Sequence, residues 1–430
     1  MEEDIFMEFQ IIENERLGEK YYRLHHRSGL VINVFPKEGY NSTYAIIGTN
    51  FGSVNNHFIS NGKEIKVPDG TAHYLEHKLF ESEEGDAFSR YAKTGAMANA
   101  YTSFEKTCYL FSCTENFRES LEILLDLIQS PYFTPETVAK EQGIIGQEIK
   151  MYDDSADWRV MMNLYQAMYH NNPINIDIAG DVQTIAEITP EILYECYNAY
   201  YNLNNMVLSI AGNVSPYEVL EIADSKLKDS PKLDTQTIFP DEPYEVKEKY
   251  VEQRLPVAVP MFCLGFKENA KTEMPTIKEL VCTDILLEAF AGESSELYRE
   301  LLDRKLINST FGADYLAGRG YRAVMFDGET HSPSEAAEAI CEGVRKLHET
   351  GISREDFEIA RRSVYGRAVS GFDSLSATAN QLIDSEFIGK TLFDQIEIIA
   401  NITFEDVTER LKDQLDPENI SLSVIKGIDE

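Results

Sequence analysis

The sequence predicts an α+β protein of two similar domains, each an antiparallel sheet packed with helices. Three observations lead to this prediction. The chain has 430 residues, which is too long for one ordinary hydrophobic core. A sequence repeat relates its two halves. Segments with strand and helix patterns follow one another without the regular alternation that a doubly wound parallel sheet requires.

The repeat lies near the end of each half. Residues 188–210 align without gaps on residues 402–424, and seven of the 23 positions are identical. Both copies have the pattern of a capped helix, a short polar turn and a strand. We interpret the pair as a duplicated domain; chance similarity of two helix–turn–strand units is the alternative. The segment 228–244 has three prolines and no helical period, which favours a linker. The expected domains are therefore residues 1–228 and residues 245–430.

Several elements of the first half are predicted directly from their residue types. Residues 43–54 and 108–113 are rich in aromatic and β-branched residues, which is typical of strands. Residues 117–128 have apolar residues at helical spacing. Thr134-Pro135-Glu136 predicts the start of a second helix, with Thr as cap, Pro in the first turn and an acid near the positive end of the helix dipole.

The net charge of −34 limits the classes of partner. A strongly acidic surface repels phosphate backbones and anionic lipid, which argues against a nucleic-acid or membrane-surface role. It favours cationic or weakly charged substrates, although solubility alone also explains it.

The cysteines and the N-terminal residues predict a cytoplasmic protein. The first ten residues, MEEDIFMEFQ, are acidic where a signal peptide needs a basic start. No stretch approaches the about 20 consecutive apolar residues that span a bilayer. The cysteines form no CxxC pair, so we expect buried or free thiols in a reducing compartment. They are Cys108, Cys113, Cys196, Cys263, Cys282 and Cys341.

The segment DGTAHYLEHKLF, residues 69–80, carries the chemistry. His73 and His77 are four residues apart, so on a helix both imidazoles project from one face and can reach one metal ion. Glu76 lies on the same side but is offset, where it can reach an attacking water. This is the inverted zincin order, HxxEH. The alternative is two surface histidines on an amphipathic helix. We favour the metal, because Leu75 and Leu79 predict burial, and two unliganded histidines beside a buried acid are costly.

A hydrolytic zinc site needs a third protein ligand and an open position for water. Glu141 and Glu148 are seven residues apart, two turns along one helical face. Either carboxylate could complete a His2Glu site, and the other would then orient an imidazole. The metal lowers the pKa of its water, and Glu76 would take the proton and pass it to the leaving amine. His2Glu sites also accept cobalt or manganese, so the native metal stays open.

These motifs resemble the pitrilysin/insulinase family of zinc peptidases. HYLEH (73–77) is similar to the zinc helix of the family, and KEQGIIGQEI (140–149) to its distal element, whose second Glu ligates the metal. The resemblance therefore implies one Zn2+ per chain held by His73, His77 and Glu148, with Glu141 outside the ligand shell.

The resemblance also implies how substrate is held. Residues 99–111 resemble the family's edge strand, which pairs with the substrate backbone, here through Asn99 and Ala100 as an added β-strand. In this family, which has the processing-peptidase/LuxS-like metallohydrolase fold, the two domains of a chain form a half-shell, and two half-shells close around a chamber. Ala360 and Arg367 fall where Glu141 and Glu148 sit, so we expect the second domain to have no metal site.

One departure from the family bears on partners. Active members carry an Arg followed seven residues later by a Tyr in a C-terminal domain, but Arg304 is followed by Phe311. Losing one oxyanion donor costs on the order of 10²–10³ in rate. The chain resembles the zinc-bearing subunit of bacterial two-subunit members. We therefore expect a paralogous partner that supplies the Arg/Tyr pair, or a homodimer, with peptides as substrates.

The motifs predict a zinc endopeptidase, and two other functions are alternatives to it. The first is a non-catalytic, peptide-binding or core subunit of a processing complex, whose family relatives lose the zinc residues that this chain keeps. The second is a small-molecule metallohydrolase sharing the HxxEH helix. Such enzymes are single small domains, so a duplicated chain argues against it.

Overall fold

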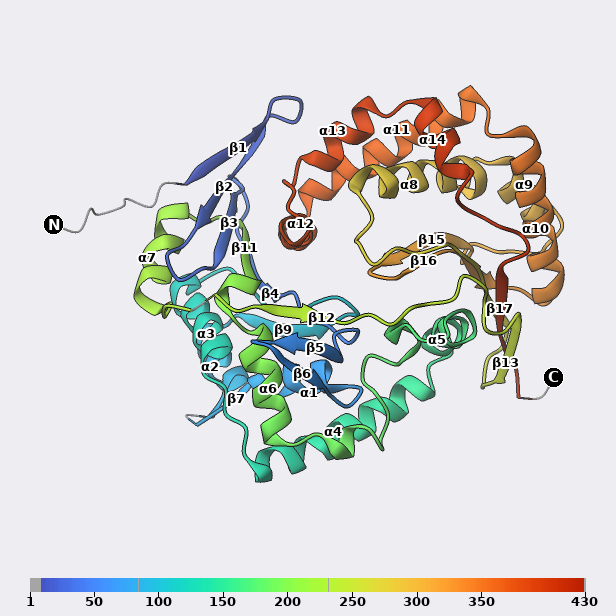
Figure 1. The fold of residues 1–430 in the computed structure, drawn as a ribbon. Coiled ribbons are helices and arrows are strands. Elements are labelled where there is room, and N and C mark those ends of the chain that lie inside the picture. Colours follow the sequence, from blue (N-terminus) through green and yellow to red (C-terminus); the bar gives the residue numbers. More distant parts are fainter. Residues whose placement is uncertain (1–8, 84, 231, 429–430) are drawn as a thin grey trace. The chain divides into compact units, whose positions relative to one another are not determined.

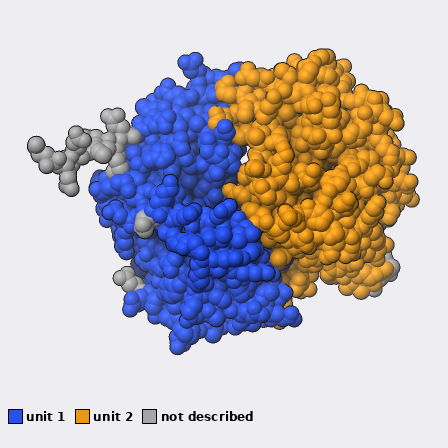
Figure 2. Space-filling view, in the orientation of Figure 1, with its two compact units in different colours: residues 1–147, 177–238, 369–393 blue, residues 148–176, 239–368, 394–430 orange. Residues whose placement is uncertain are grey.

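The computed structural model describes residues 9–83, 85–230 and 232–428. The acidic segment that argues against a signal peptide lies, except for its last two residues, outside the described residues. The chain forms two compact units (Figure 2). Unit 1 consists of residues 1–147, 177–238 and 369–393, and unit 2 of residues 148–176, 239–368 and 394–430.

Unit 1 is built on a seven-stranded sheet with the strand order β1-β2-β3-β11-β4-β10-β9 (Figure 1). Strands β3 and β11 are parallel, and the other neighbouring pairs are antiparallel. Strand β9 is therefore an edge strand with β10 as its neighbour. The strands are β1 (Gln10–Asn14), β2 (Glu19–His25), β3 (Val31–Pro36), β4 (Thr43–Thr49), β9 (Met97–Thr102), β10 (Thr107–Cys113) and β11 (Met206–Gly212).

Helices pack against both the β9 edge and the centre of this sheet. Helix α1 packs on β9 and β10, α3 on β10 and β4, α7 on β3, and α12 on β4 and β11. The helices of unit 1 are α1 (Thr71–Leu79), α2 (Ala87–Thr94), α3 (Phe117–Gln129), α6 (Pro190–Tyr200), α7 (Pro216–Lys226) and α12 (Leu375–Phe387), with 3-10 turns at Ile185–Glu187, Leu203–Asn205 and Gly371–Asp373. Two small sheets complete it, one of β5 (His57–Ser60), β6 (Lys63–Lys66) and β12 (Thr235–Thr237), the other of β7 (Glu81–Ser82) and β8 (Gly85–Asp86).

Unit 2 has a five-stranded sheet with the order β13-β17-β14-β16-β15. Figure 1 shows α8, α11, α13 and α14 on one side of this sheet and α5 on the other. The strands are β13 (Tyr250–Arg254), β14 (Met261–Lys267), β15 (Gly312–Gly318), β16 (Tyr321–Glu329) and β17 (Ile420–Lys426). The helices are α5 (Ala156–Met168), α8 (Ile277–Ala291), α9 (Glu296–Asp303), α10 (Pro333–Thr350), α11 (Arg354–Ser370), α13 (Asp394–Asn401) and α14 (Phe404–Leu411), with a 3-10 turn at Pro173–Asn175.

The two sheets confirm the duplication and the α+β fold class. The order β3-β11-β4-β10-β9 in unit 1 corresponds to β13-β17-β14-β16-β15 in unit 2, and in each the first pair is parallel and the rest are antiparallel. The aligned repeat forms the same elements in both units, α6 with β11 and α14 with β17. Thr189 and Thr403 cap the two helices, each accepting a hydrogen bond from a backbone N–H of the first turn.

Each copy of the repeat contributes one helix to the other unit. Helix α5 follows the first copy's α4 (Pro135–Asp153) but packs on β14 and β17, while α12 follows the second copy's α11 but packs on β4 and β11. Each helix passes close to a glycine on its sheet. A Cβ on Gly48 would lie 3.1 Å from Ile383, and one on Gly265 would lie 2.5 Å from Met168. The predicted domains, 1–228 and 245–430, follow the two repeat copies and stay a prediction; the compact units differ by these exchanged segments.

Several local predictions are confirmed. Strand β10 and helix α3 lie where the sequence predicts them, and of the strand predicted at 43–54 only Thr43–Thr49 is formed, as β4. All six cysteines are free and buried. The expected linker, residues 228–244, also contains a short strand: Thr235–Thr237 pairs with β5, because its two β-branched threonines suit an extended edge. In the described part of the chain, no helix combines the length and the apolarity needed to cross a membrane.

Candidate metal centre

Helix α1 presents the HxxEH residues from a mostly buried position. It begins after Gly70, whose φ of 86° is left-handed and whose added Cβ would lie 2.4 Å from the carbonyl oxygen of Ala179. Only glycine fits this start. His73 and Glu76 are each 7% exposed, and His77 is partly exposed. The imidazole rings of the two histidines lie 4.6 Å apart, centroid to centroid, as expected for residues one helical turn apart.

Two buried side chains join α1 to the first turn of helix α4 (Pro135–Asp153). The hydroxyl of Tyr74 donates to the carbonyl oxygen of Val138 at 2.5 Å. The fully buried ammonium of Lys78 pairs with Glu81 and lies 3.3 Å from the carbonyl oxygen of Thr137. Burial raises the pKa of Tyr74 to about 12, and the charge of Glu141 adds to this effect. The phenol therefore stays neutral and keeps donating.

Helix α4 carries both candidate carboxylates. As predicted, the side chain of Thr134 caps it, accepting from the backbone N–H of Thr137 at 3.2 Å. The helix runs without interruption past residues 147 and 148, where the chain passes from unit 1 to unit 2. Glu141 is 7% exposed. Because the helix is continuous, its geometry fixes the position of Glu148 two turns beyond Glu141.

The structure brings three of the predicted residues together. One ligand atom from each of His73, His77 and Glu148 lies within 4.8 Å of the others. Two metal bonds of about 2.1 Å bridge donors up to about 4 Å apart, so a small side-chain adjustment closes the group on one ion. Two imidazoles and one carboxylate are a donor set that suits zinc. Across the described residues, no second group of three such side chains meets this criterion.

Hydrogen bonds orient the ligand group from outside. Glu141 Oε1 lies 3.0 Å from Nδ1 of His77, which would leave Nε2 of that ring for a metal ion. The hydroxyl of Tyr152 donates to Glu148 Oε1 at 2.9 Å. Thr102 donates from its hydroxyl to Glu76 Oε2 at 2.7 Å. Sequence reasoning missed Tyr152 and Thr102. The spacing of Tyr152, four residues after Glu148, was an available signal, whereas nothing local links Thr102 to Glu76.

The predicted substrate-binding residues lie on edge strand β9. Asn99 pairs with Leu110 and Ala100 with Tyr109 across the β9–β10 ladder. The side-chain oxygen of Asn99 accepts a hydrogen bond from the backbone N–H of Ala100 at 2.9 Å. Asn99 thus satisfies a backbone donor at the edge of the sheet.

In unit 2, the two positions that correspond to Glu141 and Glu148 in the repeat are not carboxylates, and no metal site is predicted there. Ala360 and Arg367 are on α11, the counterpart of α4. Ala360 is 1% exposed, and the guanidinium of Arg367 donates to Glu288 on α8 at 2.8 Å. Phe311, at the position of the missing tyrosine, packs in an aromatic cluster with Tyr298 and Phe326.

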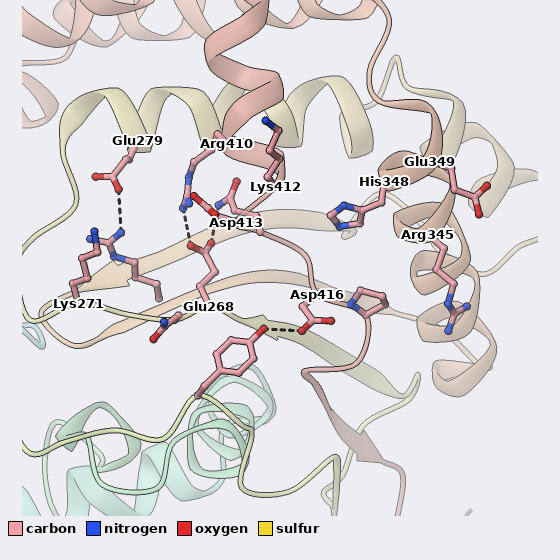
Figure 3. A pocket seen from close by; sticks show the side chains of 15 residues that line it. Glu268, Lys271, Glu279, Arg345, His348, Glu349, Arg410, Lys412, Asp413 and Asp416 are labelled. Carbon is pink, nitrogen blue, oxygen red and sulfur yellow. Dashed lines mark hydrogen bonds and ion pairs between the residues drawn. The ribbon is translucent and has the colours of Figure 1, made fainter.

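A separate cavity of about 900 Å³ in unit 2 shows no metal-ligand pattern (Figure 3). Four of its charged side chains form two ion pairs within the wall. Arg410 contacts Glu268 at 2.7 Å, and Arg322 contacts Glu279 at 3.2 Å. Its histidine, His348, contacts the carbonyl oxygen of Leu415 at 3.1 Å. We interpret these contacts as structural.

The duplicated α+β fold and the His-His-Glu group together define a zinc metallopeptidase architecture. Family comparison agrees with this class. Residues 62–182 match the model described as insulinase (peptidase family M16), and residues 187–364 match the peptidase M16 inactive domain. The chain is 38% identical to the uncharacterized zinc protease YmfH of Bacillus subtilis over 96% of this chain and 97% of that protein. The chain belongs to the insulinase family, peptidase family M16.

Two further relatives extend the comparison. A crystal structure described as an M16-like peptidase from Alicyclobacillus acidocaldarius superposes with a TM-score of 0.90 and 32% identity, covering 99% of both chains. The mitochondrial-processing peptidase subunit beta of Homo sapiens is 30% identical over 167 residues, which is 38% of this chain and 34% of that protein.

Proposed function

We propose that the chain is a zinc endopeptidase that hydrolyses peptides held as an added strand along β9. One observation carries the proposal: donor atoms of His73, His77 and Glu148 lie within 4.8 Å of one another, and Glu76 lies on the same helix between the two histidines. The family of the chain and the zinc-protease name of its relative YmfH support the proposal.

Five side chains would share the work of peptide hydrolysis. His73, His77 and Glu148 would hold one zinc ion, which when bound makes water a stronger acid and polarises the scissile carbonyl. Glu76 would accept a proton from the attacking water and deliver it to the leaving amine. Its burial excludes bulk water, which strengthens its interaction with the reacting groups. Glu141 would hold the ring of His77 and raise its basicity.

Substrate would be held through its backbone. Strand β9 offers the outer side of a sheet to an extended peptide, and main-chain hydrogen bonds at Asn99 and Ala100 would align the scissile bond with little regard to sequence. The amide side chain of Asn99, which now accepts from Ala100 N–H, would have to turn away or share this donor. A chamber that closes around the peptide is part of this proposal.

A second subunit would complete the active site. The sequence lacks the Arg/Tyr pair, and Phe311, which packs against Phe326, offers no hydroxyl at that position. A paralogous subunit that supplies the pair, or a second copy of the chain, would stabilise the oxyanion. That one relative is named as a subunit, mitochondrial-processing peptidase subunit beta, supports an assembly. A cytoplasmic location stays a prediction, supported by the free cysteines.

The test uses the chain isolated from its source cells together with any protein that co-purifies. The complex should contain one zinc per copy of this chain and cleave an internally quenched peptide. Glu76→Gln should keep the zinc and lose at least about 10²-fold in kcat, whereas His73→Ala should lose both. Zinc-free protein that cleaves peptides at the same rate would refute the proposal. Bound peptide without cleavage by any preparation would favour a non-catalytic, peptide-binding subunit.

A further inference from the structure

The proposed base is held by a hydroxyl from the strand that would bind substrate. Thr102, the last residue of β9, donates from Oγ1 to Glu76 Oε2 at 2.7 Å. Hydrogen bonds between a neutral donor and a carboxylate are short and about twice as strong as neutral pairs. Glu76 is 7% exposed, so water competes little for this bond.

A second threonine lies beside the first. Thr107 lies opposite Thr102 in the β9–β10 register and is fully buried. Its hydroxyl donates to the carbonyl oxygen of Phe51 at 2.8 Å and lies 3.4 Å from the hydroxyl oxygen of Thr102. Since the single proton of Thr107 goes to the shorter contact, the proton of Thr102 is left to point to Glu76.

We propose that Thr102 is a positioning residue that ties the carboxylate of Glu76 to the substrate-binding strand. This inference rests on the proposed function. Strand β9 would fix the scissile bond and, through Thr102, also the base that serves it. A glutamate on a helix has three side-chain torsions, and the hydroxyl commits Oε2 to the strand. The same strand then positions both the base and the peptide, and this fixed relative position is what a near-attack geometry requires.

The isosteric variant Thr102→Val removes the donor and keeps the shape of the side chain. It should lower kcat about 10- to 100-fold, as expected for losing a hydrogen bond to a charged group, with KM changed less than about twofold and zinc content unchanged. Thr102→Ser, which keeps the hydroxyl, should restore kcat to within about threefold of the original. Thr102→Val in the Glu76→Gln background should add no further loss, because the group it positions is gone.

Thr49→Val is the matched control. Thr49 ends β4, is fully buried and donates to the carbonyl oxygen of Tyr200 at 2.8 Å, so its loss costs stability in the same sheet without touching Glu76. It should leave kcat and KM unchanged at a temperature well below unfolding. A fall in kcat equal to that of Thr102→Val would mean a general effect of the sheet and would overturn the proposal.

The remaining outcomes separate this inference from the proposed function. If Glu76→Gln is inactive and Thr102→Val matches the original in kcat, only the positioning role fails. A rise in KM alone for Thr102→Val would assign the residue to substrate binding and also overturn it. If Glu76→Gln is fully active, the proposed function itself fails. Should Thr102→Val not fold, a kcat for Thr102→Ser as low as that of Thr102→Ala would overturn the role of the hydroxyl.

Discussion

Glu141 lies 3.0 Å from Nδ1 of His77 through one carboxylate oxygen, and this contact selects which ring nitrogen faces the other ligands. The contact joins α1 to α4 two helical turns before Glu148. It fixes the tautomer of His77 before any metal arrives, because an Nδ1 that donates to a carboxylate leaves a lone pair on Nε2.

Replacing Glu141 by Gln should weaken zinc binding about 10- to 100-fold, because the neutral amide orients His77 less firmly and raises its basicity less. Competition with a chromophoric chelator measures the affinity. Glu136→Gln, in the exposed first turn of the same helix, is the control and should leave affinity unchanged. Equal affinities for all three proteins would contradict the role of Glu141.

Tyr152→Phe should lower zinc affinity about 10-fold, since the hydroxyl that donates to Glu148 at 2.9 Å fixes a ligand carboxylate. The ring should keep its place, because it packs on Trp158 with centroids 5.2 Å apart. Tyr250→Phe is the control: this tyrosine also donates to a glutamate, Glu252, at 2.6 Å, but away from the ligand group. A drop in affinity for both variants would show that the effect is not specific.

Asp284 should make stability depend on pH. Burial raises the pKa of this carboxyl to about 6, the charge of Arg367 opposes the rise and that of Asp314 adds to it. A raised pKa means that the folded state favours the protonated form. The protonated carboxyl of Asp284 therefore makes its full contribution to the stability of the folded state below the unfolded pKa of about 3.9. This contribution is lost as pH rises through about 6.

The neutral isostere Asp284→Asn should remove this dependence. At pH 7.5 it should raise the free energy of unfolding by about 1–3 kcal/mol relative to the original, and near pH 4 by little. Urea midpoints at both pH values measure the difference. Asp303→Asn, on an exposed position of α9, should have no effect at either pH. The same gain at pH 4 and pH 7.5 would show that titration of Asp284 is not the cause.

Two glycines should respond to alanine in opposite directions. Gly143 is an exposed position inside α4, and an added Cβ would have nothing within 4 Å. Gly143→Ala should raise the free energy of unfolding by about 0.5–1 kcal/mol, because alanine has the higher helix propensity. Gly70→Ala should lower it by about 2 kcal/mol or more, because φ is 86° and the carbonyl of Ala179 lies in the way. Thermal melts compare them, and a shared direction would refute this account of α1 and α4.

Local sequence predicted the elements whose pattern is short-range. The spacing of His73 and His77 determines that both rings leave one face of a helix, and the interval from Glu141 to Glu148 does the same for α4. Strands β4 and β10 and the cap of Thr134 also follow from neighbouring residues. The repeat made the two similar sheets predictable, since the same pattern twice implies the same unit twice.

Contacts between distant elements could not be predicted from residue patterns. Helix α12 follows α11 in sequence, yet it packs on the sheet of unit 1, and α5 packs on that of unit 2. Both are ordinary amphipathic helices, whose apolar stripes do not specify a partner sheet. The contact of Thr102 with Glu76 could not be predicted either, because strand β9 and helix α1 come together only through packing.

The sequence by itself determined which residues of this chain are candidates to bind a metal and to act on water, because helical periodicity places them on shared faces. The tertiary structure alone decided that the two helices approach closely enough for one ion. It also decided which hydroxyls and carboxylates hold the ligands and the base. Periodicity is a property of neighbouring residues, whereas the distance between two helices depends on how the whole unit packs its core.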